Sequence, residues 1–268
     1  MMPSEFRCRS GYNWQGGATL LLLVWNHFWH QKWSLFSSLL MPVLYFLFII
    51  MALSPMMDSF DRGHYSMGYR EYALVGLMAM NLVTQMGKTI HQVYLDRKNG
   101  LFAMHMQSGI RPLLYIILKG LPSVLGFLFQ ASCFWGLIVW FQIQIFWDHF
   151  VWLCLVGLIS LFFWISMGVI LSLFSGSGIT RNMVLSFFLM LLTFSAPSFY
   201  VYENAPWLVK FVSRLNPLTY QLEVMRDAAF ASPSWQSLAL LCLLSLLSLA
   251  VAMAITNRIP LFEKEQSP

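Results

Sequence analysis

Long apolar runs alternate with short polar segments along most of this chain. Each run is close to the roughly 20 residues that a helix needs to cross a bilayer. The third run continues toward Phe146, so its helix could end at Phe134 or extend as far as Phe146 at the outer side. Pro42 and Pro122 fall inside runs, where a helix bundle tolerates the kinks we expect from them. The pattern predicts six membrane-spanning helices at about residues 34–53, 72–93, 113–134, 151–174, 183–200 and 237–256.

The first 33 residues follow a different pattern. Bulky apolar residues alternate there with polar ones such as Asn26 and Lys32, and the apolar run is too short to span a bilayer. Residues 1–33 are therefore predicted to form an amphipathic helix in the cytoplasmic interface, ahead of a six-span domain at 34–268. His27 and His30 share a face of this helix and could bind a metal, although histidines at a membrane boundary usually need no such role.

The polar stretch before the last apolar run has a helical period of its own. Apolar residues recur at intervals of three and four on both sides of Asn216 and Pro217. We predict two short helices over residues 201–231, with Pro217 in the first turn of the second. Charged residues such as Glu203 and Arg226 keep this hairpin out of the lipid core, where each would cost several kcal/mol.

Composition and charge place the chain in a membrane and orient it. Hydrophobic residues make up 58% of it and charged residues only 10%, which excludes an ordinary soluble domain. Placing both termini in the cytoplasm puts eleven of the sixteen Lys and Arg residues on the inner side, as the positive-inside rule requires. The net charge of +5 thus reflects membrane topology, and no nucleic-acid partner is expected. The same orientation places the hairpin at residues 201–231 on the outer side, so we call it the outer hairpin.

The inner loop at residues 96–112 is charged at both ends and apolar in the middle. Asp96 or Asn99 is expected to cap a short helix over residues 100–108, which Gly109 and Pro112 would end. Such a helix either lies on the membrane surface or docks a cytoplasmic partner.

Motifs near the end of the chain carry a resemblance to a known family. The chain reads SAPSFY at residues 195–200, ENAP at 203–206 and NPLTY at 216–220, followed by Arg226. In order and spacing these segments closely resemble the end of the type-2 ABC exporter permeases, the membrane subunits of drug, lipid and polysaccharide exporters. The inner loop, DRKNG at residues 96–100, is similar to the coupling segment DRE.G of that family, with Lys98 where the family usually has Glu.

The resemblance implies a fold, partners and a function. The fold would be all-α integral membrane, with six transmembrane helices, an N-terminal interfacial helix and an outer helical hairpin before the last span. Two copies would form the pathway, and each would dock a separate ABC ATPase subunit that binds ATP and Mg²⁺, so that the chain itself needs no cofactor. The complex would export an amphipathic substrate (a drug-like natural product, a lipid or a lipid-linked glycan) across the cytoplasmic, or inner, membrane.

The same resemblance assigns roles to individual residues. Arg226 would be a structural or gating charge with Glu223 or Glu203 as partner, the alternative being a surface ion pair of little energy. The ATPase-docking set is Asp96, Arg97, Lys98, Gly100, Leu101, Phe102, Met104 and Met106. The outer gate is Glu203, Asn216, Pro217, Tyr220, Glu223 and Arg226. Asn81, Gln85 and Gln130 are polar at membrane depth, and either pair between helices or face a conduit.

Other chemistry finds little support in the residues. The run Gly87, Lys88, Thr89 resembles the end of a phosphate-binding loop, but Leu82 stands where that motif needs glycine, so Lys88 is expected to snorkel toward the inner surface. No serine lies in a nucleophile motif, and the cysteines lack metal-ligand spacing. We therefore expect neither catalytic nor metal-binding residues. The alternative function is a multi-pass membrane enzyme or assembly factor without transport activity.

Overall fold

The structure is a computed structural model. It describes residues 18–19, 21–22, 25–26, 36, 40–57, 60–61, 66–174, 179–200, 202, 205–231 and 233–259. The predicted interfacial helix over residues 1–33 therefore lies almost wholly outside the described residues, as do Glu203 and the C-terminal tail after residue 259.

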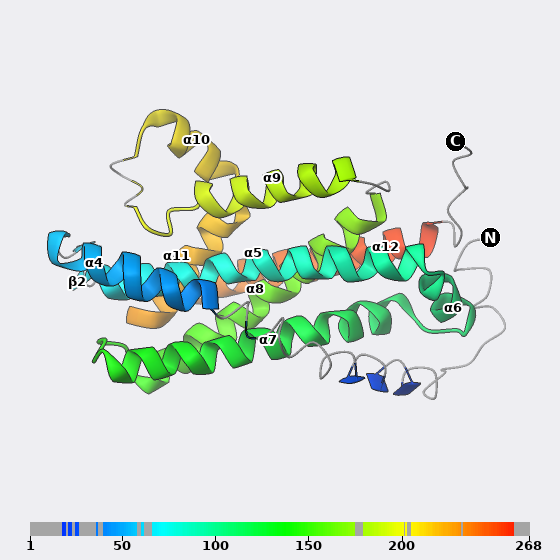
Figure 1. The fold of residues 1–268 in the computed structure, drawn as a ribbon, viewed down its shortest axis with the longest axis horizontal. Helices are drawn as coiled ribbons and strands as arrows, with labels where there is room; N and C mark the ends of the chain where they lie inside the picture. Colours follow the sequence, from blue (N-terminus) through cyan, green and yellow to red (C-terminus); the bar gives the residue numbers. More distant parts are fainter. Residues whose placement is uncertain are drawn as a thin grey trace.

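The described chain is built almost entirely of helices (Figure 1). A two-residue strand pair, in which Phe60 lies opposite Met67, precedes the first long helix. The elements in chain order are the π-helix η1 (Tyr45–Ile50), α4 (Met51–Leu53), the 3₁₀-helix η2 (Ser54–Met56), β1 (Phe60–Asp61), β2 (Ser66–Met67), α5 (Tyr69–Lys98), α6 (Leu101–Gln107), α7 (Pro112–Trp140), α8 (Trp147–Phe174), α9 (Ile179–Ser195), α10 (Trp207–Leu215), α11 (Pro217–Phe230) and α12 (Trp235–Arg258).

Three helices of the described chain are long and apolar enough to cross a membrane. They are α7, α8 and α12, which contain the predicted third, fourth and sixth spans, and α7 continues through Pro122. Shorter apolar helices at Leu40–Met56 and Leu185–Ser195 coincide with the predicted first and fifth spans. The second predicted span lies within α5, which has 30 residues but is not among the three apolar helices. A helical membrane protein is therefore confirmed, and the count of six spans stays a prediction.

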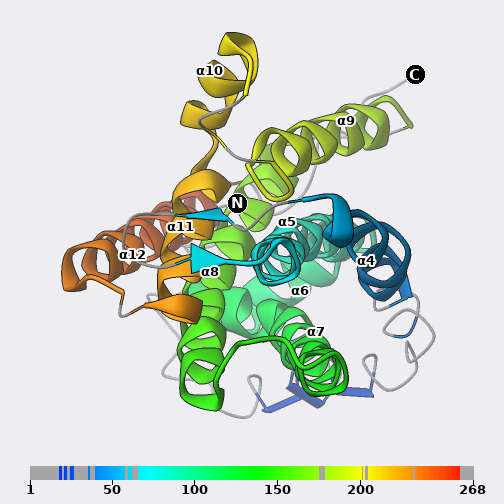
Figure 2. The same ribbon diagram turned by 90° about the vertical axis from the view of Figure 1, so that its left-hand side faces the viewer.

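Helix α8 lies at the centre of the bundle, with α5, α7, α11 and α12 packed around it (Figure 2). Two glycines allow close approach. A Cβ at Gly157 would meet the ring of Phe127 on α7, and one at Gly168 would lie 3.0 Å from the Met86 carbonyl oxygen on α5. Small residues serve the same purpose at helix contacts in membranes generally. The packing leaves α8 in position to relay movements among the other helices.

Helix α10 projects from this bundle, and α9 lies along one side of it, packed against α5 (Figures 1 and 2). Large apolar side chains of α9, such as Phe187 and Met190, are exposed, and so is Phe48 of η1. Exposed apolar side chains of this kind are suited to contact with lipid or with another protein chain.

Candidate functional site

Helix α6 joins α5 to α7 at one end of the bundle (Figure 1). Gly100 precedes it with φ +73° and Gly109 follows it with φ +84°, a left-handed conformation that glycine adopts without steric cost. The predicted short helix over residues 100–108 is thus confirmed as Leu101–Gln107. The expected N-terminal cap is wrong, because the N-cap is Gly100 and no side chain caps the helix. Gly109 ends the helix as expected, whereas Pro112 begins α7.

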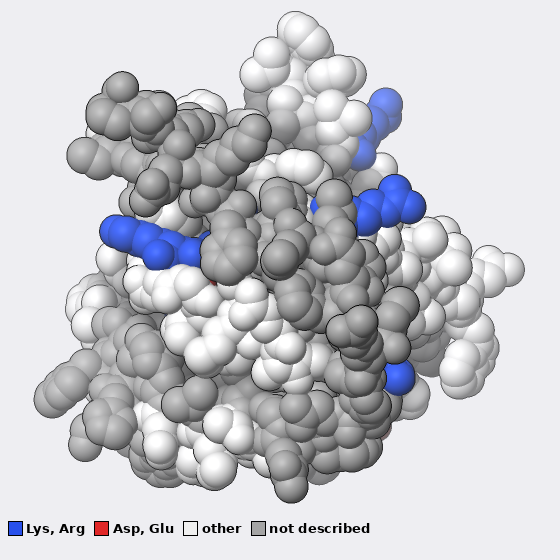
Figure 3. All heavy atoms as spheres, turned by 90° about the vertical axis from the view of Figure 1, so that its right-hand side faces the viewer, with Lys and Arg blue, Asp and Glu red and all other residues white. Residues whose placement is uncertain are grey.

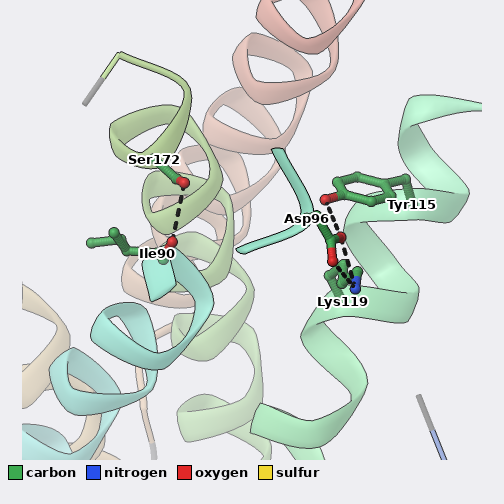
Figure 4. Close-up of polar contacts among 5 residues, drawn as sticks. All are labelled: Ile90, Asp96, Tyr115, Lys119 and Ser172. Atoms are coloured by element: carbon green, nitrogen blue, oxygen red, sulfur yellow. Dashed lines mark hydrogen bonds and ion pairs between the residues drawn. The ribbon is translucent and has the colours of Figure 1, made fainter. Parts of the chain in front are cut away.

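The carboxylate that was expected to cap α6 instead joins the two helices on either side of it. Asp96, near the end of α5, is only 4% exposed. It accepts a hydrogen bond of 2.7 Å from the Tyr115 hydroxyl, and the Lys119 ammonium lies 2.9 and 2.7 Å from its two oxygens (Figure 4). Tyr115 and Lys119 both belong to the beginning of α7. A buried charge pair with this geometry holds α5 and α7 together, since parting it would leave either charge uncompensated.

The two faces of α6 differ in exposure. Phe102 and Met106 are buried, and the Phe102 ring packs edge-on against Tyr115 at 5.5 Å between ring centroids. Leu101 and Met104 point the other way and are 37% and 53% exposed. Within the predicted docking set, the exposed members are Lys98, Gly100, Leu101 and Met104, while Asp96, Phe102 and Met106 face the bundle.

The remaining member of that set contacts a third helix. Arg97 is half-buried, and its Nη1 donates to the Leu173 carbonyl at 2.9 Å, in the last turn of α8. Nearby, the Ser172 hydroxyl donates to the Ile90 carbonyl of α5 at 3.1 Å (Figure 4). The last turns of α5, just before α6, are thus bonded to the beginning of α7 and to the end of α8.

The end of the molecule that carries α6 is basic. Lys and Arg side chains project from it at several places, and Asp and Glu scarcely show on the described surface there (Figure 3). The sequence supplies these cations at helix ends, through Arg97 and Lys98 of α5, Arg111 before α7, and Arg258 of α12. Cations at helix C-termini also interact favourably with the carbonyl groups that end each helix.

At the opposite end, residues 196–200 after α9 are held by α5 and α11. The Tyr72 hydroxyl lies 3.0 Å from the Pro197 carbonyl oxygen and 2.7 Å from that of Tyr200. Arg226 of α11 donates to the same Pro197 carbonyl at 2.7 Å. A Cβ at Gly76 would overlap the Ser198 carbonyl oxygen, so this segment lies directly on α5. We call residues 72, 76, 197, 198 and 226 the outer clamp.

Arg226 is the centre of the outer clamp. Its side chain is 0% exposed, and its guanidinium carbon lies 3.5 Å from the centre of the Tyr72 ring, a cation–π arrangement. The alternative of a surface ion pair is therefore wrong. Of the two expected carboxylate partners, Glu203 lies outside the described residues, and Glu223 is partly buried on α11.

Asn216 ties the hairpin to the last turn of α9. Its Oδ1 accepts from the Leu218 amide at 2.9 Å and so caps α11, as its place before Pro217 at the first helical position allows. Its Nδ2 donates to the Leu192 carbonyl at 2.6 Å. Tyr220 stays exposed on the hairpin. The predicted break between two short helices is confirmed, and Asn216, Pro217 and Arg226 gather around the end of α9.

The three polar residues predicted at membrane depth are divided between two places. On α5, Gln85 Nε2 donates to Asn81 Oδ1 at 3.3 Å, whereas Gln130 is buried on α7. Asn81 alone of the three lines a cavity of about 280 Å³ between α5, α9 and the segment Leu40–Met56. Pairing within one helix was not among the expected arrangements, which were pairing between helices or exposure to a conduit.

Sequence reasoning missed Tyr72 and the buried Trp164–Gln221 pair, in which the Trp164 Nε1 donates to Gln221 Oε1 at 2.6 Å across α8 and α11. Tyr72 looks like an ordinary interfacial aromatic at the start of a span, and no local pattern distinguishes it. Among the residues whose positions are described, no group of three or more His, Cys, Asp or Glu is placed to hold a metal ion.

Comparison with known proteins adds one finding. The family model described as "ABC-2 type transporter" matches residues 18–230. That range includes α6, both helices of the hairpin and the outer clamp. A search among curated proteins found no match.

Proposed function

Because the chain belongs to the ABC-2 type transporter family, and is by that membership a membrane permease subunit, we propose that it serves an ATP-driven exporter. The chain acts as a homodimer, and each copy docks a separate ABC ATPase subunit that binds ATP and Mg²⁺. The complex moves an amphipathic substrate across the cytoplasmic membrane. The bundle is embedded in the lipid of that membrane, and both termini lie in the cytoplasm.

The observation that carries this proposal is the construction of α6. Leu101 and Met104 form an exposed apolar face at the basic end of the molecule, where a partner could bind. The opposite face packs onto Tyr115 of α7 through Phe102. A load on the exposed face would therefore reach α5 and α7 together, because Asp96 and Lys119 join those helices beside α6.

The outer clamp is suited to respond at the far end. It joins residues 196–200, which follow α9, to α5 and α11 through the Tyr72 hydroxyl and Arg226. Any shift of α5 against α11 would strain these bonds, since one carbonyl oxygen, that of Pro197, accepts from both helices. The clamp is thus our candidate for the outer gate.

Exposed apolar surface supports the homodimer. The outward side chains of α9 and η1, including Phe187 and Phe48, have no cover within the described chain. A second copy placed over them would enclose the space between α9 and the segment Leu40–Met56, and would give the substrate a path between two copies.

The test is recovery of the ATPase. The full chain is solubilised from its native membrane and its partners are identified by mass spectrometry, beside the double variant Leu101→Asp/Met104→Asp. Phe146→Asp is the matched control, because Phe146 is an exposed apolar residue at the other end of the bundle. We expect an ABC ATPase with the unmodified chain and the control, and at least a tenfold loss with the double variant.

Two results would count against the proposal. If the unmodified chain recovers no ATPase under conditions that preserve known transporter complexes, the membrane enzyme or assembly factor becomes the better hypothesis. If the double variant retains the ATPase in full, α6 does not dock it.

A further inference from the structure

Helix α5 forms one wall of the cavity beside it. The lining is mostly apolar and comes from α5, as with Leu77 and Met80, as well as from the segment Leu40–Met56 and α9, as with Tyr45 and Phe194. Three polar residues of α5, Asn81, Thr84 and Lys88, also line it. Their spacing of three and four residues puts them on one helix face, over two turns or about 10 Å of helix length.

Asn81 has an unused hydrogen-bond donor at this wall. Its side chain is 4% exposed, and its Oδ1 accepts from the Thr84 hydroxyl at 2.8 Å and from Gln85 Nε2 at 3.3 Å. These bonds fix the orientation of the amide. Its Nδ2 has no hydrogen-bond partner within the described residues. A buried amide donor that is left unpaired is unfavourable, so this position favours an acceptor oxygen supplied from outside the chain.

Lys88 supplies a positive charge at the end of the cavity nearer α6. It is half-buried, and in the part of the chain that the structure describes no carboxylate or hydrogen-bond acceptor pairs with it. The nearest acid along α5, Asp96, is already paired with Lys119. A cation in a cavity with a mostly apolar lining attracts an anion, because ion pairs strengthen as water is excluded.

We propose that this cavity binds an anionic single-chain amphiphile. Its acid group pairs with Lys88, an oxygen farther along the molecule accepts from Asn81 Nδ2, and its hydrocarbon lies against Tyr45 and Phe199. From Leu77 to Lys88 the α5 wall extends about 16 Å, which is the reach of a medium-length alkyl chain. The inference deepens the proposed function by naming the class of exported substrate. Binding of the amphiphile stands by itself, whereas its export rests on the proposed function.

Binding can be measured without the ATPase. The full chain in nanodiscs of neutral lipid is photolabelled with a diazirine-tagged dodecyl phosphate, and the labelled residues are identified by mass spectrometry. Competitors share the chain and differ in head group: dodecyl phosphate, dodecyltrimethylammonium and dodecyl maltoside. We expect label on cavity residues such as Met80 and Phe194, and efficient competition by dodecyl phosphate alone.

Variants separate the charge from the shape of the site. Lys88→Gln should lower labelling at least tenfold, and Lys88→Arg should retain it. Asn81→Leu should weaken several-fold the competition by a dodecyl phosphate that carries a mid-chain hydroxyl, whose oxygen can accept from Asn81 Nδ2. Lys210→Gln removes the same charge from α10, away from the cavity, and should label as the unmodified chain does. Size-exclusion profiles and unfolding midpoints establish that each variant is folded.

Equal competition by the three head groups, or full labelling of a folded Lys88→Gln chain, would overturn the proposal. The proposal would also fail if a second copy of the chain occupies the cavity. In that case a Met41→Cys chain that forms a disulfide-linked dimer would resist labelling, while the unmodified chain, with its native cysteines, would be labelled. If the chain recovers no ATPase but is labelled at the cavity, the proposed function alone is overturned. If the chain recovers the ATPase but is not labelled at the cavity, this inference alone is overturned.

Discussion

Tyr72 and Arg226 donate hydrogen bonds to the same carbonyl, that of Pro197, and the guanidinium lies 3.5 Å above the Tyr72 ring. A carbonyl oxygen has two lone pairs and can accept both donors. The two side chains come from α5 and α11, so the segment after α9 is held by a junction of three elements rather than by a single contact.

The junction can be divided by substitution. Tyr72→Phe keeps the ring under the guanidinium but removes the one O–H donor that the Pro197 and Tyr200 carbonyls share, so we expect a loss of about 1–3 kcal/mol in the free energy of unfolding. Arg226→Ala also removes the cation–π contact and leaves a cavity, and should be more destabilising. Thermal unfolding in detergent measures both. The double variant should cost less than the sum of the single ones, because the residues share a partner. Additive losses would show that the two side chains act independently.

The Asp96–Lys119 pair should behave as a buried ion pair. Asp96→Asn or Lys119→Met alone leaves one charge unpaired, and we expect each to cost about 3–5 kcal/mol. The double variant removes both charges and should regain much of that loss, as judged by denaturation in detergent. Asp148→Asn is the control, since Asp148 is exposed on α8 and should change stability by less than about 0.5 kcal/mol. A double variant no more stable than the single variants would mean that the pair does not act as a unit.

Two helix glycines offer a matched comparison. A Cβ at Gly76 would overlap the backbone carbonyl of Ser198, whereas one at Gly136 meets no atom within 4 Å among the described residues. Gly136→Ala should therefore stabilise α7 by roughly 0.5–1 kcal/mol through helix propensity. Gly76→Ala should push residues 196–200 off α5 and lower both stability and transport. The readouts are the unfolding midpoint and export by reconstituted complexes. Equal effects of the two substitutions would contradict the close contact.

His105 should make stability depend on pH. Burial lowers the pKa of this α6 histidine, while Asp96 opposes the shift and Lys119 adds to it. Since the folded pKa lies below the ordinary value of about 6.5, the unfolded chain takes up the proton first as the pH falls. Stability should thus be full above about pH 6.5 and decline as the pH falls through the folded pKa.

The check for that dependence is the unfolding midpoint at several pH values between about 5 and 8. His105→Phe should flatten the dependence, because a neutral ring of similar size cannot titrate. His91→Phe is the control, since His91 is exposed on α5. A pH profile that is unchanged in His105→Phe would assign the dependence to another group.

What the sequence could predict was local. The short helix α6 and the pair α10 and α11 follow from apolar spacing and from glycine and proline positions within a few residues, and the structure has them. The capping role expected of Asp96 was wrong, because its partners Tyr115 and Lys119 are 19 and 23 residues away. Pro197 lies 125 residues from Tyr72, and only packing brings them together. Contacts between residues so far apart leave no periodic pattern in a single amino-acid sequence, so they cannot be predicted from it.

The arrangement around α6 has a mechanical consequence. Helices α5 and α7 are linked twice at this end, covalently through α6 with its two glycine corners and again through the Asp96–Lys119 bond, so the end of α5, α6 and the beginning of α7 form a closed loop. Such a loop keeps the two helices from sliding past each other unless the ion pair parts. A push on α6 would therefore rotate α5 as a rigid lever of about 45 Å, 30 residues long, instead of being lost in loop bending. Tyr72 lies at the far tip of that lever, where a small rotation produces its largest displacement.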